Sequence, residues 1–252
     1  MEFRKYTPLD KDSQRKKFGD PFPETWFVGI RHAIYFSGQQ DIIQKMKPIL
    51  TSQHRTVSLT GERGIGKTRI AIEYAYQERS NYIDEGVLFL NATSAQTLEK
   101  DFQQFAKNPE QNTDSVLEWI NKHKAALVIL DNINEELVQR FISCKSHLLV
   151  TSPTKINGIE NIQIEKLNDR DGALLMLKRS NTILVRQGLE DASPLQQKNA
   201  VELSALLDGM PAQLEAVGKY IDDTGKTVEL CLRYGKDVLL GLPETRAENP
   251  II

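Results

Sequence analysis

Apolar residues in the first two thirds of the chain form short runs that are separated by amphipathic segments. The runs typical of strands cover residues 56–60, 86–91, 125–132, 147–152 and, more weakly, 161–164. Before and between them, apolar residues recur every three or four positions, as on one helix face, over residues 42–50, 69–76, 95–107, 113–123 and 135–142. The run at 125–132 does not alternate, which is typical of a strand covered on both faces. The pattern therefore predicts an α/β fold with a mainly parallel sheet.

From about residue 166 onward, the hydrophobic pattern is helical only. Helices are expected at residues 168–180 and 194–207, from Pro211 onward, and at 227–240. Pro211 suits the first turn of a helix, where the missing backbone N–H costs nothing. The pattern predicts a small all-helical subdomain of ordinary domain size after the α/β layers.

A glycine-rich loop connects the first predicted strand to the helix that follows it. The loop reads Gly61-Glu62-Arg63-Gly64-Ile65-Gly66-Lys67-Thr68. This G-x-x-x-x-G-K-T spacing between a strand and a helix is typical of a phosphate-binding loop (P-loop). Its glycines let the backbone wrap around an anion, which the helix N-terminus also attracts. We expect Lys67 to neutralise the β- and γ-phosphates and Thr68 to ligate Mg²⁺. The alternative is a glycine-rich turn without a ligand.

An aspartate ends the most apolar of the predicted strands. Asp131 would lie at the carboxyl end of a parallel strand, where ligands bind in open α/β sheets. We expect it to order Mg²⁺ beside the P-loop. The alternative is an N-cap for the helix at 135–142, a role open to Asp131 or Asn134. Asp41 and Thr113 are the expected N-caps of two other helices.

Composition excludes several classes of protein. The 252 residues carry a net charge of −2, so nothing argues for a nucleic-acid or anionic-membrane partner. The N-terminus has no signal-peptide pattern, and no apolar run is long enough to span a membrane. Cys144 and Cys231 lie far apart, as expected in a reducing compartment, so we predict a cytoplasmic protein. The four histidines show no metal-ligand spacing.

These patterns predict a P-loop NTPase fold: a three-layer α/β/α domain with a mainly parallel sheet, followed by the helical subdomain. The expected division is an N-terminal tail or linker at 1–34, a nucleotide-binding domain at 35–165, the helical subdomain at 166–241 and a C-terminal tail at 242–252.

The order of six motifs resembles that of the STAND-class P-loop NTPases, in particular the NB-ARC domains of NOD-like receptors. The six matching segments are Phe36-Ser37-Gly38, the P-loop, and residues 127–131, 149–152, 163–175 and 207–214. By this resemblance the helical subdomain is ARC1-like, and the chain is a cytoplasmic switch in immune or cell-death signalling. The ADP form would be closed, and the ATP or dATP form would open and self-associate.

The resemblance also implies roles for single residues. Phe36, Ser37 and Gly38 would border the base, and Pro211 would pack near the adenine. Thr151 and Ser152 would lie near the γ-phosphate. Arg69, which directly follows the P-loop, is also expected to contact the nucleotide. The effector and sensor domains would lie outside this chain, which we expect to be part of a longer protein.

Three departures from the family pattern bear on hydrolysis. Gln39 stands where the family usually has arginine, Pro153 where many members carry an arginine, and Asn132 where many have a second acid. An arginine would sense the γ-phosphate, and the second acid would orient or deprotonate the attacking water. We therefore expect nucleotide binding with weak or no hydrolysis, in which Asp131 would be the catalytic residue.

Two alternatives to the switch are an active AAA-like ATPase, which remodels proteins or loads factors on DNA, and a scaffold with a vestigial P-loop. The ATPase would need an arginine supplied by a second subunit, and Arg140, Arg170 and Arg179 are candidates that the sequence does not separate.

Overall fold

The computed structural model describes residues 26–27, 35–52, 55–106, 110, 112–181, 185 and 188–242. The tails predicted at 1–34 and 242–252 therefore lie mostly outside the described residues. One exception is β1 (Trp26–Phe27), a two-residue strand that pairs in parallel with β3 and that the hydrophobic pattern did not predict. Within the described part of the chain, no helix is long and apolar enough to cross a membrane.

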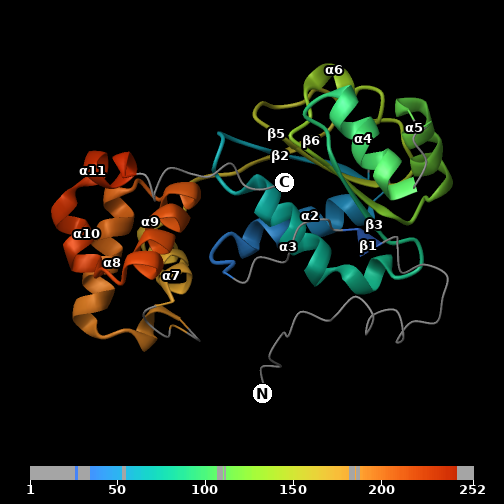
Figure 1. The fold of residues 1–252 in the computed structure, drawn as a ribbon. Helices are drawn as coiled ribbons and strands as arrows, with labels where there is room; N and C mark the ends of the chain where they lie inside the picture. The colour runs from blue at the N-terminus through green and yellow to red at the C-terminus, as the bar shows by residue number, and fades with distance from the viewer. Residues whose placement is uncertain are drawn as a thin grey trace.

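The described strands form one parallel sheet of six strands in the order β1-β3-β4-β5-β2-β6 (Figure 1). Besides β1, they are β2 (Thr56–Thr60), β3 (Val87–Asn91), β4 (Leu127–Asp131), β5 (His147–Ser152) and β6 (Glu160–Gln163). Every pair in register is parallel, so the carboxyl ends of β2, β4 and β5 lie at one edge of the sheet. The predicted α/β fold with a parallel sheet is confirmed.

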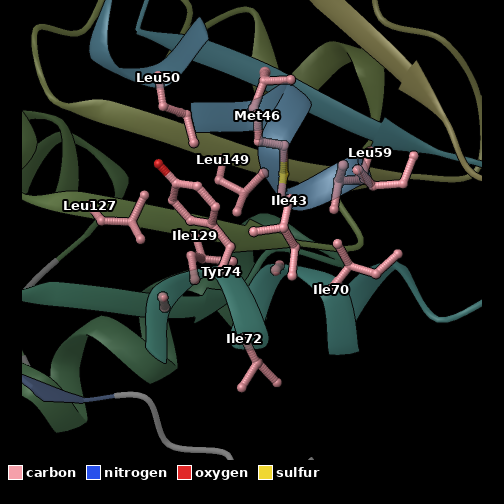
Figure 2. Close-up of a cluster of buried hydrophobic side chains, with 14 of the residues drawn as sticks. Ile43, Met46, Leu50, Leu59, Ile70, Ile72, Tyr74, Leu127, Ile129 and Leu149 are labelled. Atoms are coloured by element: carbon pink, nitrogen blue, oxygen red, sulfur yellow. The ribbon is translucent and has the colours of Figure 1, made fainter. Parts of the chain in front are cut away.

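Helices cover both faces of the sheet because successive strand residues point to opposite sides. Ile129 of β4 packs with α2 (Gln40–Thr51) and α3 (Lys67–Gln77), as Figure 2 shows for the cluster around Tyr74. Its neighbours Val128 and Leu130 face the opposite layer. That layer consists of α4 (Ala95–Ala106), α5 (Thr113–Lys122) and α6 (Glu135–Val138). The unalternating apolar run in β4 is thus explained by burial on both faces.

The remaining helices gather beside the sheet around a core of their own (Figure 1). They are α7 (Asp169–Ser180), α8 (Pro194–Leu206), α9 (Pro211–Thr224), α10 (Val228–Tyr234) and α11 (Lys236–Gly241). Two short 3₁₀ helices, η1 (Arg79–Tyr82) and η2 (Leu189–Asp191), complete the described elements. Leu177, Leu203, Leu214 and Tyr220 are almost fully buried in this core.

Several predicted helix bounds are wrong. The helix expected at 135–142 ends at Val138. The helix expected at 227–240 is two helices, because Gly235 adopts a left-handed φ of 73° and ends α10. The residue at the N-cap position of α2 is Gln39, so Asp41 lies in the first turn instead.

Other N-caps follow the capping rule but at neighbouring positions. Asn112 caps α5 in a capping box with Ser115, which makes Thr113 the first residue of that helix. Asn134 caps α6 by accepting from the Leu137 N–H at 2.7 Å, so Asp131 is free of the capping role that was its alternative.

Candidate nucleotide site

The P-loop lies at the carboxyl edge of the sheet, between β2 and α3. Gly61, Gly64 and Gly66 have φ values of 148°, 86° and 99°, which side chains disfavour and glycine tolerates. Gly66 occupies the N-cap position of α3 and offers no side chain to cap it. The N–H groups of the first turn of α3 therefore have no side-chain cap at this position and can bind an anion.

Lys67 folds over this loop. Its Nζ donates to the carbonyl oxygens of Gly61 (2.7 Å) and Glu62 (2.9 Å). Burial lowers the pKa of the Lys67 ammonium, and the negative charges of Asp131 and Glu62 oppose that shift. A half-buried ammonium that rests on two carbonyls can exchange them for phosphate oxygens with little further desolvation.

Thr68 and Asp131 meet at the first turn of α3. The Thr68 hydroxyl donates to Asp131 Oδ1 at 2.8 Å, and the Thr151 hydroxyl donates to the same oxygen at 2.7 Å. Burial raises the pKa of the Asp131 carboxyl, whereas these two hydrogen bonds and the charge of Lys67 act in the opposite direction. The structure thus brings together three of the residues predicted to serve the phosphates and the metal.

Oxygen ligands of this kind fit Mg²⁺, which takes one or two carboxylates together with hydroxyl, water and phosphate oxygens. Thr68 Oγ1 and Asp131 supply one hydroxyl and one carboxylate. In the described part of the chain, no group of three His, Cys, Asp or Glu residues could hold a metal by itself. A magnesium ion here would take its other ligands from water and from oxygens of a bound nucleotide.

Asn132 belongs to a second polar cluster, which the sequence reasoning missed. Its backbone N–H donates to Thr151 Oγ1 at 2.8 Å, and its Nδ2 donates to Thr93 Oγ1 at 3.2 Å. The Thr93 hydroxyl in turn donates to Asn91 Oδ1 at 2.6 Å. The sequence offered no signal for this cluster, because it forms only where β3 lies beside β4 with Asn91 in register with Asp131.

The helical subdomain contacts the P-loop through the start of α9. The Ala212 N–H donates to the Gly64 carbonyl at 3.1 Å. A side chain at Gly64 would place its Cβ 3.0 Å from Ala212 Cβ, and one at Gly66 would lie 3.9 Å from Pro211 Cγ. Pro211 is thus close to the backbone of the P-loop, whereas its predicted place beside the adenine stays a prediction.

A cavity of about 350 Å³ adjoins the other side of the P-loop. It is lined by Glu62, Ile65 and residues 163–166, which are the last residue of β6 and the three that follow it. Gln39 reaches this segment through a 2.7 Å hydrogen bond from its Nε2 to the Glu165 carbonyl. Gly38 is equally close, since a Cβ there would lie 2.8 Å from Leu167 Cδ2. Gln39 and Gly38 therefore contact the segment that follows β6, part of which lines this cavity. That Phe36–Gly38 border a base stays a prediction.

The other candidate residues are less distinctive. Phe36 packs against the core under α2 and α3, and Ser37 is half-buried beside Gly38. Arg63 is exposed in the loop, and Arg69 is half-buried in the first turn of α3. The Ser152 hydroxyl is buried at the end of β5 and accepts from the Thr154 N–H at 3.3 Å.

Comparison with known proteins supports the P-loop NTPase fold. The family model described as type III restriction enzyme, res subunit, matches residues 34–176, which is more than half of the chain. A solved Walker-type ATPase of Pyrococcus abyssi, PABY2304, is 13% identical with a TM-score of 0.51, over 79% of this chain and 71% of that one. At this identity, the likeness shows the fold alone.

Two other solved structures are similar at lower TM-scores. The Thermotoga maritima RuvB Holliday junction branch migration motor is 14% identical (TM-score 0.46), over 81% of this chain and 68% of its own. PCH-2 of C. elegans is 13% identical (TM-score 0.48), over 79% and 66%. No curated protein is similar enough in sequence to match the chain.

Proposed function

The chain belongs to the family described as type III restriction enzyme, res subunit, and we propose that it binds ATP or ADP with Mg²⁺ and acts as a nucleotide-dependent switch. In this proposal, residues 35–165 bind the nucleotide and residues 166–241 form a helical subdomain that responds to it. The finer assignment, to the STAND class and its NB-ARC type, rests on the motif order in the sequence.

The observation that carries the proposal is the convergence of Lys67, Thr68 and Asp131 at the N-terminus of α3. The ammonium, the hydroxyl and the carboxylate lie where the β- and γ-phosphates and a magnesium ion would bind a P-loop. The Thr68 to Asp131 hydrogen bond of 2.8 Å places both oxygen ligands close enough to share one metal ion.

Contacts between the P-loop and the helical subdomain support the switch. Besides the hydrogen bond from Ala212 to Gly64, Lys166 lies 4.0 Å from Glu62 of the P-loop and forms a close ion pair with Asp208, three residues before Pro211. These contacts join the loop to the start of α9 at two points. A change in the loop on nucleotide binding would therefore be felt by the helical subdomain.

Weak hydrolysis follows from the residues around the expected position of the γ-phosphate. Asn132 replaces a second acid, and its carboxamide cannot accept a proton from water. The Thr151 hydroxyl donates to the Asp131 carboxylate and accepts from the Asn132 N–H. These bonds favour a role of Asp131 in holding the metal over one in taking a proton from water. We propose slow turnover at most, with Asp131 acting through the metal.

The decisive experiment denatures freshly purified protein and identifies the released nucleotide by mass spectrometry. Retained ADP, slow turnover and a change in oligomeric state between the ADP and ATP forms, measured by light scattering, support the switch. Absence of any nucleotide affinity would reject it in favour of a scaffold with a vestigial P-loop.

A second candidate is an active ATPase that works on nucleic acid or protein. The family description, which names a restriction-enzyme subunit, favours nucleic acid as the target. This candidate predicts fast turnover that rises with protein concentration, because the missing arginine would come from a second subunit. Stimulation of turnover by added DNA would separate it further from the switch.

A further inference from the structure

A larger cavity, of about 1040 Å³, lies at the opposite edge of the sheet. It is bordered by the end of α2, the start of β2 and the segments that precede β4, β5 and β6. The five residues of β2 separate it from the P-loop by about 16 Å, at 3.3 Å per residue. The cavity is therefore distinct from the nucleotide site.

Arg55 lies in the wall of this cavity and is held by three hydrogen bonds. Its Nη1 donates to the carbonyl oxygens of Lys124 (3.2 Å) and Lys145 (3.0 Å), and its own carbonyl accepts from the Leu148 N–H at 2.6 Å. Its φ of 47° is uncommon for a residue with a long side chain. Such a conformation persists where the surrounding contacts determine it, as these three do.

The guanidinium of Arg55 is only partly satisfied by these contacts. It has five N–H groups, of which the two on Nη1 can serve the two carbonyls. The other three, on Nε and Nη2, have no acceptor among the residues that the structure describes. The Nε and Nη2 edge is the one that binds a carboxylate through two parallel hydrogen bonds.

Two lysines line the cavity together with Arg55. Lys124 and Lys145, whose carbonyls it holds, are exposed, and neither forms an ion pair within the described ranges. Among the described lining residues, Glu160 is the only acid. The nearby Glu85 carboxylate accepts from the Ala125 N–H at 2.8 Å. The cavity therefore has an excess of positive charge that matches an anionic ligand.

Part of the same cavity is apolar. Ile49, Ile142 and Ile159 line it, together with Pro48 at the end of α2. An aliphatic or aromatic side chain that covers these residues would gain the free energy of apolar burial. The ligand that fits has both a carboxylate and an apolar group.

We propose that this cavity binds an acidic segment of a partner protein, with a carboxylate on Arg55 and an apolar side chain against the three isoleucines. Nucleic acid fits less well, because its binding is dominated by contacts of many cations with phosphates and the cavity offers three cations. A small ligand also fits less well, because the volume is at the upper limit of about 300–1,000 Å³ for small-molecule sites.

Selection from a heptapeptide library displayed on phage tests the proposal. The full chain serves as bait, with counter-selection on a K124E/K145E double variant. Both lysines are exposed, so the variant should fold, whereas Arg55→Ala would remove two backbone hydrogen bonds. Enriched peptides should carry Asp or Glu beside an aliphatic or aromatic residue.

The affinity of a labelled synthetic copy of the enriched peptide is then measured by fluorescence anisotropy. The K124E/K145E variant should bind this peptide about tenfold to a hundredfold more weakly than wild type does. Wild type should show a similar loss for a peptide in which Gln or Asn replaces each Glu or Asp. Lys100→Glu, an exposed lysine on α4, is the matched control and should bind as wild type does.

Three results would overturn the proposal: no enrichment, enriched peptides without acidic residues, or equal affinity for wild type and the double variant. Competition by a short DNA duplex that depends on Lys124 and Lys145 would assign the cavity to nucleic acid instead. None of these outcomes depends on the P-loop, so failure here leaves the nucleotide proposal intact.

Discussion

Replacing Lys67 with alanine should weaken triphosphate binding far more than monophosphate binding. The ammonium is placed for two phosphate groups, and a hydrogen bond to a charged partner contributes about 1.5–3 kcal/mol. Two such contacts would give about 3–6 kcal/mol, or roughly 10²- to 10⁴-fold in affinity. The lower part of this range applies, because the bound lysine gives up its hydrogen bonds to the carbonyls of Gly61 and Glu62.

Isothermal titration with ATP, ADP and AMP in the presence of Mg²⁺ measures the effect. ADP should lose roughly half of that free energy, since one of the two phosphates is missing, and AMP should bind as it does to wild type. The control is Lys178→Ala, because burial also lowers the pKa of Lys178 but this lysine lies on α7, away from the P-loop.

A Lys67→Ala protein that binds ATP within threefold of wild type would refute the reasoning, whatever its effect on ADP. Equal losses for ATP and AMP would also count against it, because they would indicate a damaged loop and not a missing phosphate contact. Thermal unfolding of the free protein separates the two cases: removal of a half-buried ammonium should leave its Tm nearly unchanged.

Three other predictions follow from neighbouring contacts. Burial raises the pKa of Asp131, and Mg²⁺ needs its carboxylate form. Mg²⁺-dependent ATP affinity should therefore fall on acidification, with a midpoint above the ordinary carboxyl pKa of 3.8. Asp131→Asn should abolish the Mg²⁺ dependence of ATP binding in titrations. Asn132→Asp supplies a general base, and aspartate tolerates the φ of 58° at this position. The substitution should raise ATP turnover about 10²-fold in a phosphate-release assay. An unchanged rate would exclude activation of the attacking water as the missing step. Gly209→Ala would place a Cβ 2.1 Å from the Leu167 carbonyl and should cost more than about 2 kcal/mol in urea unfolding, whereas Gly225→Ala, with the same sign of φ and open space, should cost about 1 kcal/mol; equal costs would contradict the clash.

Features that depend on neighbours in sequence could be predicted. The hydrophobic pattern predicts both ends of β5 correctly, because the strand coincides with its own apolar run. The P-loop was predicted because the glycine positions, the lysine and the threonine lie within eight consecutive residues, and the flanking strand and helix have clear periodicity.

Gly235 splits a segment whose apolar spacing is helical throughout, although a glycine commonly ends a helix, so attention to the spacing hid a local signal. Features that depend on tertiary contacts could not be predicted. The cluster of Asn91, Thr93 and Asn132 forms only when β3 and β4 lie side by side. The importance of Arg55 depends on two carbonyls that are 69 and 90 residues away in sequence.

Gly64 connects the two proposed roles of the P-loop, to hold phosphate and to inform the helical subdomain. Its carbonyl accepts from Ala212, and a Cβ at this position would lie 3.0 Å from Ala212 Cβ, so the loop and α9 are in close contact here. Closely packed parts of a protein transmit small displacements to one another. A shift of the loop on phosphate binding would therefore move α9 or lengthen this hydrogen bond. Because Lys166 joins the same two parts from the other side, the helical subdomain would respond as one body.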